Sequence, residues 1–485
     1  MLGFDLGYLV AVPLIGAILS LLSPIRLLVA VVFSLLSLTL SLYAFYITLS
    51  MHEPIYQWVG GWTAPLGIGF KLDGVSGFFL MMSGVVSFAV GVYSLGFFKE
   101  GYKRQGRFFW FFFFFLWAGL NAFFLSEDLF NLYVALEVLS LTAVVLVALP
   151  GYRKAIKASV NYLFLSLFAS MFYLFGVAML YTNYGTLSMS LLAQRLAGTE
   201  EFVFALLPLV LALSIKSALF PFHFWLPPAH SSTVAPASAL LSGLVVKPPA
   251  YLILRLWLEV FPDNPSLEYL SWVLGGFGAL AVLFGSYYAI RQRTIKMLLA
   301  YSTVAQMGYL FLMVPVYYKA QSLEVKSLVL EGFALQAFSH ALAKASMFLS
   351  SGNAIYVAKR DEISYMPGFA HSHPFTFFAL FFSGATLIGL PLSGGFVAKF
   401  LLLKASIETG LLFQAIVFLL GSLLASLYVY PIWKESFYQD PKKVYDKPIP
   451  RFMELSTFLL GFLAFSLGLV SGFILQGITR GVAHG

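Results

Sequence analysis

The sequence predicts an all-α polytopic membrane protein with about fourteen transmembrane helices, and three observations support this fold class. Of the 485 residues, 60% are hydrophobic and only 10% are charged, and the mean hydropathy is +0.88. Such a chain cannot cover a soluble surface with polar side chains. It also divides into apolar stretches of about 20 residues, the length that crosses a bilayer core of roughly 30 Å. The third observation is the distribution of Lys and Arg among the loops.

The apolar stretches follow one another from the N-terminus to the C-terminal end. The first begins MLGFDLGYL, with an aspartate in place of a basic start and no small-residue cleavage pattern, so we expect a membrane span and not a signal peptide. In chain order the predicted spans are residues 4–23, 27–50, 74–97, 108–125, 129–149, 157–181, 203–222, 234–257, 268–290, 297–316, 328–357, 374–404, 411–433 and 453–478.

Lys and Arg gather in alternate loops between these spans. With the N-terminus outside, the outward loops hold few basic residues, and the inward loops hold most of them, at positions 26, 99–107, 153–157, 291–296, 359–360 and 434–451. This asymmetry follows the positive-inside rule, so we expect an integral protein of a prokaryotic plasma membrane with both termini outside. The formal net charge of +8 reflects this topology, and we expect no nucleic-acid partner.

The chain contains no cysteine. Thiolate-ligated iron–sulfur clusters, cysteine nucleophiles and disulfides are therefore excluded. We expect no cofactor in this chain, and any redox chemistry then belongs to a partner. No metal site is expected either, because the pairs His223/His230 and His371/His373 are placed at loop edges without a carboxylate at a ligand-like spacing.

Several basic residues fall inside the predicted spans. Arg255 and Lys404 lie near span ends, where we expect their long side chains to reach the interface. The others lie deeper, where a lysine costs ~2.5–3.5 kcal/mol to insert, so each must face protein, water or a counter-charge. These deep lysines are Lys216, Lys247, Lys344 and Lys399.

Glu137 is the one deep carboxylate of the predicted spans. Spacings of four and three residues place it on one helical face with Tyr133 and Ser140. One acid among several amines indicates proton transfer, because a buried lysine holds its proton more firmly as a carboxylate approaches and less firmly as it leaves. The alternative is a static buried ion pair between Glu137 and Lys216 that holds two helices together.

A histidine extends this polar set. Gln336, His340 and Lys344 recur every four residues and form a polar stripe on an otherwise apolar helix. Histidine exchanges a proton near neutral pH, so the stripe favours proton transfer. A hydrogen bond between helices is the alternative interpretation of His340.

Two of the predicted spans contain helix-breaking residues next to a deep lysine. Pro221 follows Lys216 by five residues, and GLPLSGGFVAKF places a proline and a glycine pair just before Lys399. Non-helical backbone at membrane depth is tolerated only where protein buries it or water reaches it. One such break in each half is typical of inverted-repeat transport folds, and simple proline kinks are the alternative.

Six motifs in a fixed order resemble one known family. They are DLFNLYVALEVLSL, KSALFPFHFWLPPAH, VAPASALLSGLVVK, YSTVAQMGY, FSHALAKASMFLSSGN and GLPLSGGFVAKF. Together they resemble the antiporter-like subunits shared by respiratory complex I, Mrp-type Na⁺/H⁺ antiporters and membrane-bound hydrogenase complexes. The resemblance covers about Leu72 to Lys404, which is most of the chain.

The resemblance implies a fold and a set of site residues. It implies one transmembrane domain over 1–485, in which three helices (1–107) precede two inverted five-helix repeats, formed by helices 4–8 (108–260) and 9–13 (268–434), and a final loop and helix follow (435–485). Helices 7 and 12 would be broken. The family's proton-carrying positions fall on Glu137, Lys216, Lys247, His340, Lys344 and Lys399, the last of which is glutamate in some relatives.

The function implied is ion translocation, with protons and possibly Na⁺ as the ions, in a multisubunit complex. Energy would come from electron transfer in partner subunits or from Na⁺ exchange, so no redox or hydrolytic chemistry is expected in this chain itself. Partners would be the bilayer and other membrane subunits, including related ones, and the aromatic run at 109–116 is expected to face lipid or a subunit.

Two other classes of function remain open. A stand-alone secondary transporter of a small solute would also use broken helices, but it would stay active when purified alone. An inert membrane anchor would not need four deep lysines, and their substitution would leave turnover unchanged.

Overall fold

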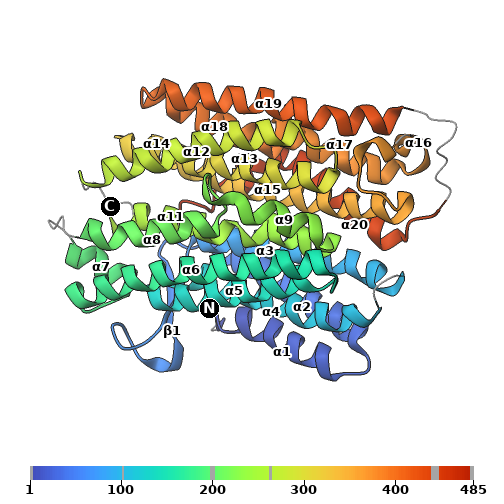
Figure 1. Cartoon of the computed structure of the whole chain (residues 1–485). Helices are drawn as coiled ribbons and strands as arrows, with labels where there is room; N and C mark the ends of the chain where they lie inside the picture. Colours follow the sequence, from blue (N-terminus) through green and yellow to red (C-terminus); the bar gives the residue numbers. More distant parts are fainter. Residues whose placement is uncertain are drawn as a thin grey trace.

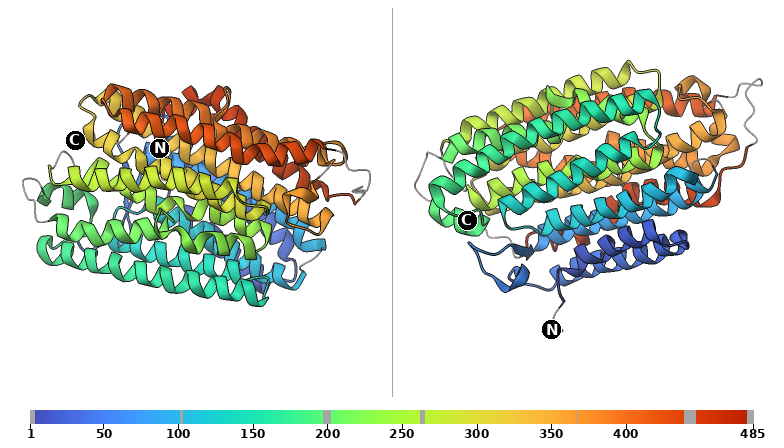
Figure 2. Two further views of the ribbon diagram at one scale, coloured as in Figure 1. Left: turned by 45° about the horizontal axis from the view of Figure 1, so that its top comes forward. Right: turned by 60° about the horizontal axis from the view of Figure 1, so that its bottom comes forward.

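A computed structural model describes residues 4–100, 103–196, 202–261, 265–366, 368–438 and 447–480 of the chain. The molecule is a bundle of helices whose long axes run in nearly the same direction (Figure 1). The N-terminal helices lie along one side of the bundle, the helices of the middle of the chain come next, and most of the C-terminal helices lie on the other side (Figure 1). In Figure 2 the last helices of the chain lie along the top of the left view, and the first helices lie along the bottom of the right view. The prediction of a mostly helical polytopic membrane protein is confirmed, because ten helices among the described residues are long and apolar enough to cross a membrane.

The first three long helices are joined by a tight turn and by a β-hairpin. A two-stranded antiparallel hairpin pairs Ile55 with Leu72 and Trp58 with Gly69. The sequence analysis did not predict these strands, because the segment between the second and third spans carries no alternating apolar pattern. The elements are α1 (Tyr8–Leu22), α2 (Arg26–Thr48), β1 (Ile55–Trp58), η1 (Val59–Gly61), β2 (Gly69–Leu72) and α3 (Gly74–Glu100).

The next part of the chain contains the first interrupted helix. α8 ends at Lys216, and the chain resumes as a short 3-10 turn and a short helix before it enters a segment with two π-helical turns. The elements are α4 (Lys103–Leu125), α5 (Leu129–Ala148), α6 (Arg153–Tyr184), α7 (Met189–Leu196), α8 (Phe202–Lys216), η2 (Phe222–Trp225), α9 (Leu226–Ser232), α10 (Ala235–Leu240), η3 (Leu241–Val245), α11 (Lys247–Arg255) and η4 (Leu256–Val260).

The last part of the chain contains the second interrupted helix, between α17 and α18. Its elements are α12 (Leu267–Ile290), α13 (Ile295–Leu312), α14 (Val314–Lys319), α15 (Leu323–Ala358), η5 (Ile363–Tyr365), α16 (Phe369–Ser372), α17 (Pro374–Ile388), α18 (Gly394–Glu408), α19 (Leu412–Phe437) and α20 (Arg451–Leu475). Each of the predicted apolar spans overlaps one of these helices or a consecutive group of them.

The longest helix, α15, lies at the centre of the bundle. It packs against α3 and α10 on one side and against α13, α17, α18 and α20 on the other. Because α15 contacts early and late parts of the chain, its polar stripe is covered from both sides. Its three stripe residues Gln336, His340 and Lys344 are all buried.

Two expectations about exposure are wrong. The aromatic run at 109–116 does not face outward as a whole. Phe109, Trp110, Phe113 and Phe114 are buried in the core, where α4 packs against α1, α3 and α5. Arg255 does not reach the interface, because its side chain is 3% exposed and ion-paired. Lys404 agrees with its prediction: it is 42% exposed and lies 3.6 Å from Glu408.

Helices α12 and α13 approach each other closely at glycine positions. A Cβ atom on Gly278 would lie 2.6 Å from the backbone nitrogen of Leu312, whereas a Cβ on Gly276 would meet nothing within 4 Å. Gly278 thus permits a contact that a larger residue would prevent.

We expect Gly278→Ala to destabilise the protein by about 1–3 kcal/mol, because the added methyl overpacks this helix contact. Gly276→Ala is the matched control on the same helix, and it should be neutral or stabilising by up to about 1 kcal/mol. Thermal unfolding of the purified protein in detergent measures both. Equal effects of the two substitutions would contradict the packing described for α12 and α13.

Candidate functional site: a row of buried lysines

The first polar centre joins α5, α6 and α8. Lys216, the last residue of α8, places its Nζ 2.9 Å from Glu137 Oε1, and the two side chains are 4% and 17% exposed. The same ammonium group donates to Ser140 Oγ at 2.9 Å and to Ser166 Oγ at 3.1 Å. Ser170 donates a further hydrogen bond to Glu137. Glu137 and Ser140 meet the lysine together because they are three residues apart on one face of α5.

The chain leaves α-helical geometry directly after Lys216. Ala218 has a φ of 54°, in the left-handed region, and helical geometry resumes only at Phe222. At the break, Ile215 O accepts from the backbone N–H of Ala218 at 3.1 Å and from the indole Nε1 of Trp225 at 3.1 Å. The break is therefore lined by protein, as backbone at membrane depth must be when it is not hydrated.

Lys247 follows the π-helical turn η3 and precedes two prolines. Its Nζ donates to Ser242 O at 2.5 Å, and Ser242 Oγ lies 2.8 Å from Thr303 Oγ1 on α13. Prolines 248 and 249 have no N–H to donate to the carbonyls of the preceding turn, so this turn departs from regular α-helix. π-Helical turns of this kind are frequent at functional sites.

Lys344 of α15 lies against the same turn of α13. Its Nζ donates to Leu299 O at 2.5 Å and to Ser302 Oγ at 2.6 Å. Leu299 O also accepts from Thr303 Oγ1 at 2.9 Å. The lysines at 247 and 344 are thus joined by a short series of polar groups on η3 and α13.

His340 lies one turn from Lys344 and is 2% exposed. Neither of its ring nitrogens has a hydrogen-bond partner in the described structure. It lies within electrostatic range of the ammonium groups of Lys247, Lys344 and Lys399. A buried ring with two unused nitrogens, among three amines, has the composition of a proton-exchange site.

Lys399 reaches back across the second helix break. Its Nζ donates to Leu387 O at 2.7 Å and to Ile388 O at 3.2 Å, the last carbonyls of α17. Leu387 O also accepts from Gln306 at 3.3 Å, and Gln306 in turn accepts from Gln336 Nε2 at 3.0 Å. The stripe on α15 is thus connected to Lys399 by side-chain amides.

The structure brings five of the six predicted site residues into three contact groups. Glu137 pairs with Lys216, Lys247 (through Ser242) and Lys344 both reach the polar turn of α13, and Lys399 is linked through Gln306 to Gln336 on α15. His340 lies among the last two groups without a hydrogen bond to any described side chain. Within the described ranges, no hydrogen bond or ion pair joins Lys216 to Lys247. All four lysines are buried, with exposed fractions from 0% to 7%.

Sequence reasoning missed two buried cationic or titratable residues. His230, predicted to lie at a loop edge, is fully buried: its ring stacks on Phe348 at 4.6 Å, and neither of its nitrogens has a hydrogen-bond partner among the described atoms. Lys296, predicted in an inward loop, is only 8% exposed and donates to Thr233 O at 2.7 Å. No signal in the sequence distinguishes His230 from its exposed neighbours, since its cover comes from α15.

A second ionic cluster lies at the end of the bundle that carries the hairpin. Arg255 donates to both carboxylate oxygens of Asp73 at 2.6 Å and also pairs with Glu259, while Lys71 lies 2.9 Å from Glu259 and 3.4 Å from Asp73. Tyr251 accepts from Arg255 Nε at 2.9 Å. Arg255 is therefore held by two acids inside the protein, which is why it does not extend to the interface.

No group of three or more His, Cys, Asp or Glu side chains within the described ranges is placed to hold a metal ion. The candidate site is thus made of amines, one carboxylate, imidazole, hydroxyls and amides. These groups can accept, hold and pass protons, and they carry no electrons.

Comparison with known proteins gives one family. Residues 126–425 match the family model described as "NADH:quinone oxidoreductase/Mrp antiporter, TM", and residues 58–109 match "NADH-Ubiquinone oxidoreductase (complex I), chain 5 N-terminus". The chain is 34% identical to NADH-quinone oxidoreductase subunit N of Desulforudis audaxviator over 413 residues, which cover 83% of this chain and 80% of the relative.

Two further relatives show the same likeness. A subunit of the Na(+)/H(+) antiporter of Alkalihalophilus pseudofirmus is 30% identical over 423 residues, which cover 84% of this chain and 82% of the relative. Among solved structures, a chain of the membrane-bound sulfane sulfur reductase, an archaeal respiratory membrane complex, superposes with a TM-score of 0.87 at 25% identity, over 98% of this chain and 96% of that one.

The ionic cluster at the hairpin end gives a prediction of its own. Burial alone would raise the pKa of Asp73, but Arg255 and Lys71 outweigh burial and hold the pKa of this carboxyl well below its usual value. A carboxyl with a lowered folded-state pKa stabilises the fold above its unfolded-state pKa of about 3.9 and loses that contribution as the pH falls further.

We therefore expect Asp73→Asn to destabilise the protein by about 3–5 kcal/mol at neutral pH, because it leaves the buried Arg255 with fewer counter-charges. The difference from the unsubstituted protein should narrow as the pH falls below about 3.9. Unfolding in detergent as a function of pH measures this. The control is Glu268→Gln, which removes the exposed ion pair with Lys319 and should change the stability of the protein little. Equal losses of stability in the two variants would contradict the account of the cluster.

Proposed function

Because the chain belongs to the NADH:quinone oxidoreductase/Mrp antiporter family of membrane subunits, we propose that it translocates ions as one subunit of a multisubunit complex. Protons would move along a row of buried side chains near the middle of the membrane. These relay residues are Glu137, Lys216, Lys247, His340, Lys344 and Lys399.

The observation that carries this proposal is the number of buried amines without a carboxylate. Of the four lysines of the relay, Lys216 alone contacts a described carboxylate, whereas Lys247, Lys344 and Lys399 donate to backbone carbonyls and a serine hydroxyl. A buried charge without a counter-charge is costly, while a neutral amine with the same contacts is not. Sites that are balanced between the two forms are suited to taking up and releasing protons.

The contacts suggest how protons would pass between the relay residues. The hydroxyls of Ser242 and Thr303, which can both donate and accept, lie between Lys247 and Lys344. In the described structure Lys247 donates to the carbonyl of Ser242, and Lys344 donates to Leu299 O and Ser302 Oγ. A proton would pass through the two hydroxyls only when the amines turn from these acceptors toward them. His340 would exchange with the three amines around it. The gap between Lys216 and Lys247 would be crossed through water or through a rearrangement at the break after α8.

We further infer fourteen membrane crossings. To the ten helices that can cross alone, we add α1, the interrupted segment α8–α9, the central helix α15 and the interrupted segment α17–α18. Counted in this way, the interruptions fall in crossings 7 and 12, which supports two five-helix repeats at 108–260 and 268–434 between 1–107 and 435–485. The distribution of Lys and Arg supports both termini outside.

The relatives named above are subunits of larger assemblies, which supports partner membrane subunits, some of them related to this chain. Energy would be supplied by electron transfer in those partners or by exchange of Na⁺ for protons. We assign no cofactor, redox step or hydrolytic step to this chain. The two energy sources would share the same relay residues.

The central test is ion transport by the whole complex in proteoliposomes after Lys216→Ala or Glu137→Ala. We expect each change to lower transport by about tenfold or more, because it removes a group that holds or recruits the proton. Assembly of the complex is measured separately by size-exclusion chromatography. The matched control is Lys157→Ala, which removes an exposed lysine of α6. Unchanged transport in both relay variants would refute the proposal.

A second test addresses the link between Lys247 and Lys344. Thr303→Val keeps the shape of the side chain and removes its hydroxyl, so transport should fall severalfold while the complex stays assembled. Thr457→Val on α20 is the control, because Thr457 is equally buried and its hydroxyl bonds only within its own helix. If the two valine variants transport equally well, protons do not pass through Thr303.

A further inference from the structure

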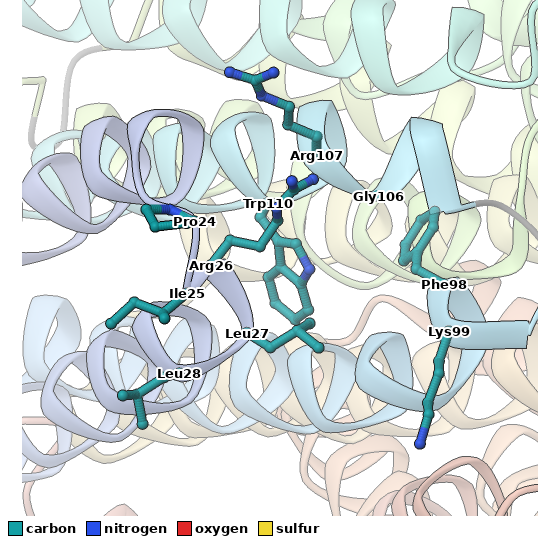
Figure 3. A pocket seen from close by; sticks show the side chains of 10 residues that line it. All are labelled: Pro24, Ile25, Arg26, Leu27, Leu28, Phe98, Lys99, Gly106, Arg107 and Trp110. Atoms are coloured by element: carbon teal, nitrogen blue, oxygen red, sulfur yellow. The ribbon is translucent and has the colours of Figure 1, made fainter.

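A groove opens at the end of the bundle opposite the hairpin, where α1 turns into α2 and α3 turns into α4. Its volume is about 460 Å³. Figure 3 shows its lining, in which Leu27 and Leu28 of α2 and Trp110 of α4 form the apolar part. Three basic side chains, Arg26, Lys99 and Arg107, also line the groove, and none of the lining residues that the structure describes carries a carboxylate.

Two of these basic side chains are set up to meet an anion. Arg107 is held in place because its Nε and Nη2 donate to Leu21 O at 3.3 and 3.0 Å. Arg26 makes no hydrogen bond or ion pair with any described residue. In Figure 3 the Arg26 side chain extends past Trp110 to the base of Arg107, the Arg107 guanidinium extends away from Arg26 beyond that point, and Lys99 points away from both. Guanidinium groups are the side chains best matched to phosphate oxygens.

A second, apolar groove adjoins the first. It has a volume of about 280 Å³, shares Trp110 with the first groove, and runs between α2 and α3 past Val31, Leu35 and Phe88. Arg26 and Leu35 are nine positions apart on α2, which is about 13 Å along the helix axis. The two grooves together therefore have a cationic end and a long apolar continuation.

We propose that the two grooves bind one anionic phospholipid. Its phosphate lies against Arg26 and Arg107, and one acyl chain follows the apolar groove past Trp110. A free phosphate ion would occupy only the cationic end and leave the apolar groove unfilled. A phospholipid matches both parts, because the groove lies on α2, whose outward residues Leu27, Leu28, Val31 and Val32 are 38% to 58% exposed, as expected for a lipid-facing helix.

The position of the groove supports an anionic lipid over a neutral one. The distribution of basic residues places this end of the bundle inside, where anionic lipids attract Lys and Arg at the membrane surface. Basic pockets between transmembrane helices on that side are known to hold anionic headgroups. This inference is independent of proton translocation, since binding is measured without transport.

The test is native mass spectrometry of the full chain in detergent, titrated with dioleoyl phosphatidylglycerol or dioleoyl phosphatidylcholine. We expect one phosphatidylglycerol molecule to bind with a dissociation constant at least about tenfold lower than that of phosphatidylcholine. Arg26→Gln should weaken phosphatidylglycerol binding about fivefold and leave phosphatidylcholine unchanged. Arg26 has no hydrogen-bond or ion-pair partner among the described residues, so this variant should fold normally.

Two further variants make the result specific. Arg153→Gln removes an exposed arginine at the start of α6, outside both grooves, and should not change binding. Val31→Trp keeps all the charges but fills the apolar groove, and should abolish the tight site. Equal binding of the two lipids, equal losses for Arg26→Gln and Arg153→Gln, or unchanged binding in a folded Val31→Trp variant would each overturn the proposal. If Val31→Trp fails to fold, the comparison of the two arginine variants decides.

Discussion

The burial of four lysine side chains in an apolar helical bundle is the constraint on which the rest of the structure depends. Each ammonium group has three hydrogens to donate and cannot reach water. Of these four lysines, Lys216 alone forms an ion pair with a described carboxylate, that of Glu137. The others depend on backbone carbonyls, and two of the three take them where the helix is irregular: Lys247 at the π-helical turn and Lys399 at the end of α17.

The helix interruptions and the lysines are therefore parts of one arrangement. A regular helix uses its carbonyls internally, so an interruption frees the acceptors that a buried amine needs. At the second break, Leu387 O serves both Lys399 and Gln306, which continues the polar contacts to α15. The centre of the bundle is thus polar, with its hydrogen bonds gathered in separate groups around each lysine.

The charged side chains at the two ends of the N-terminal part of the bundle are paired differently from the lysines at its centre. At the hairpin end, two acids and two bases neutralise one another among Lys71, Asp73, Arg255 and Glu259. At the opposite end, Arg26 and Arg107 face a groove without an acid in its lining. The first arrangement is complete within the chain, and the second presents its positive charge to a partner from outside the chain.

Periodicity and composition were sufficient to predict which segments are helical and that Lys216, Lys247, Lys344 and Lys399 are buried, but not that Lys71 and Lys296 are buried as well. The spacing of Glu137 and Ser140 also placed both on one helical face, and in the structure Lys216 donates to both. Contacts between distant segments could not be predicted in the same way. Asp73 lies 182 residues from Arg255, and the cover over His230 and Lys296 comes from helices whose neighbours no sequence pattern specifies.

The hairpin was not predicted because its strands carry too little local signal. The burial of the aromatic run was not predicted because it depends on contacts with other helices. Ile55–Trp58 and Gly69–Leu72 are too short to show an alternating pattern. Phe109 and Phe113 are as apolar as any lipid-facing residue, so composition cannot tell that they pack inward. The identity of the neighbouring helix decides the exposure of such residues.

The measurement that tests the central claim most directly is transport by the assembled complex in proteoliposomes after Lys216→Arg. Arginine keeps the positive charge and can still pair with Glu137, but it does not release its proton. If Lys216 carries protons, transport falls to the level of a Lys216→Ala variant while the complex stays assembled. If the arginine variant transports as well as the unsubstituted protein, Glu137 and Lys216 are a static ion pair, and the relay described here is wrong.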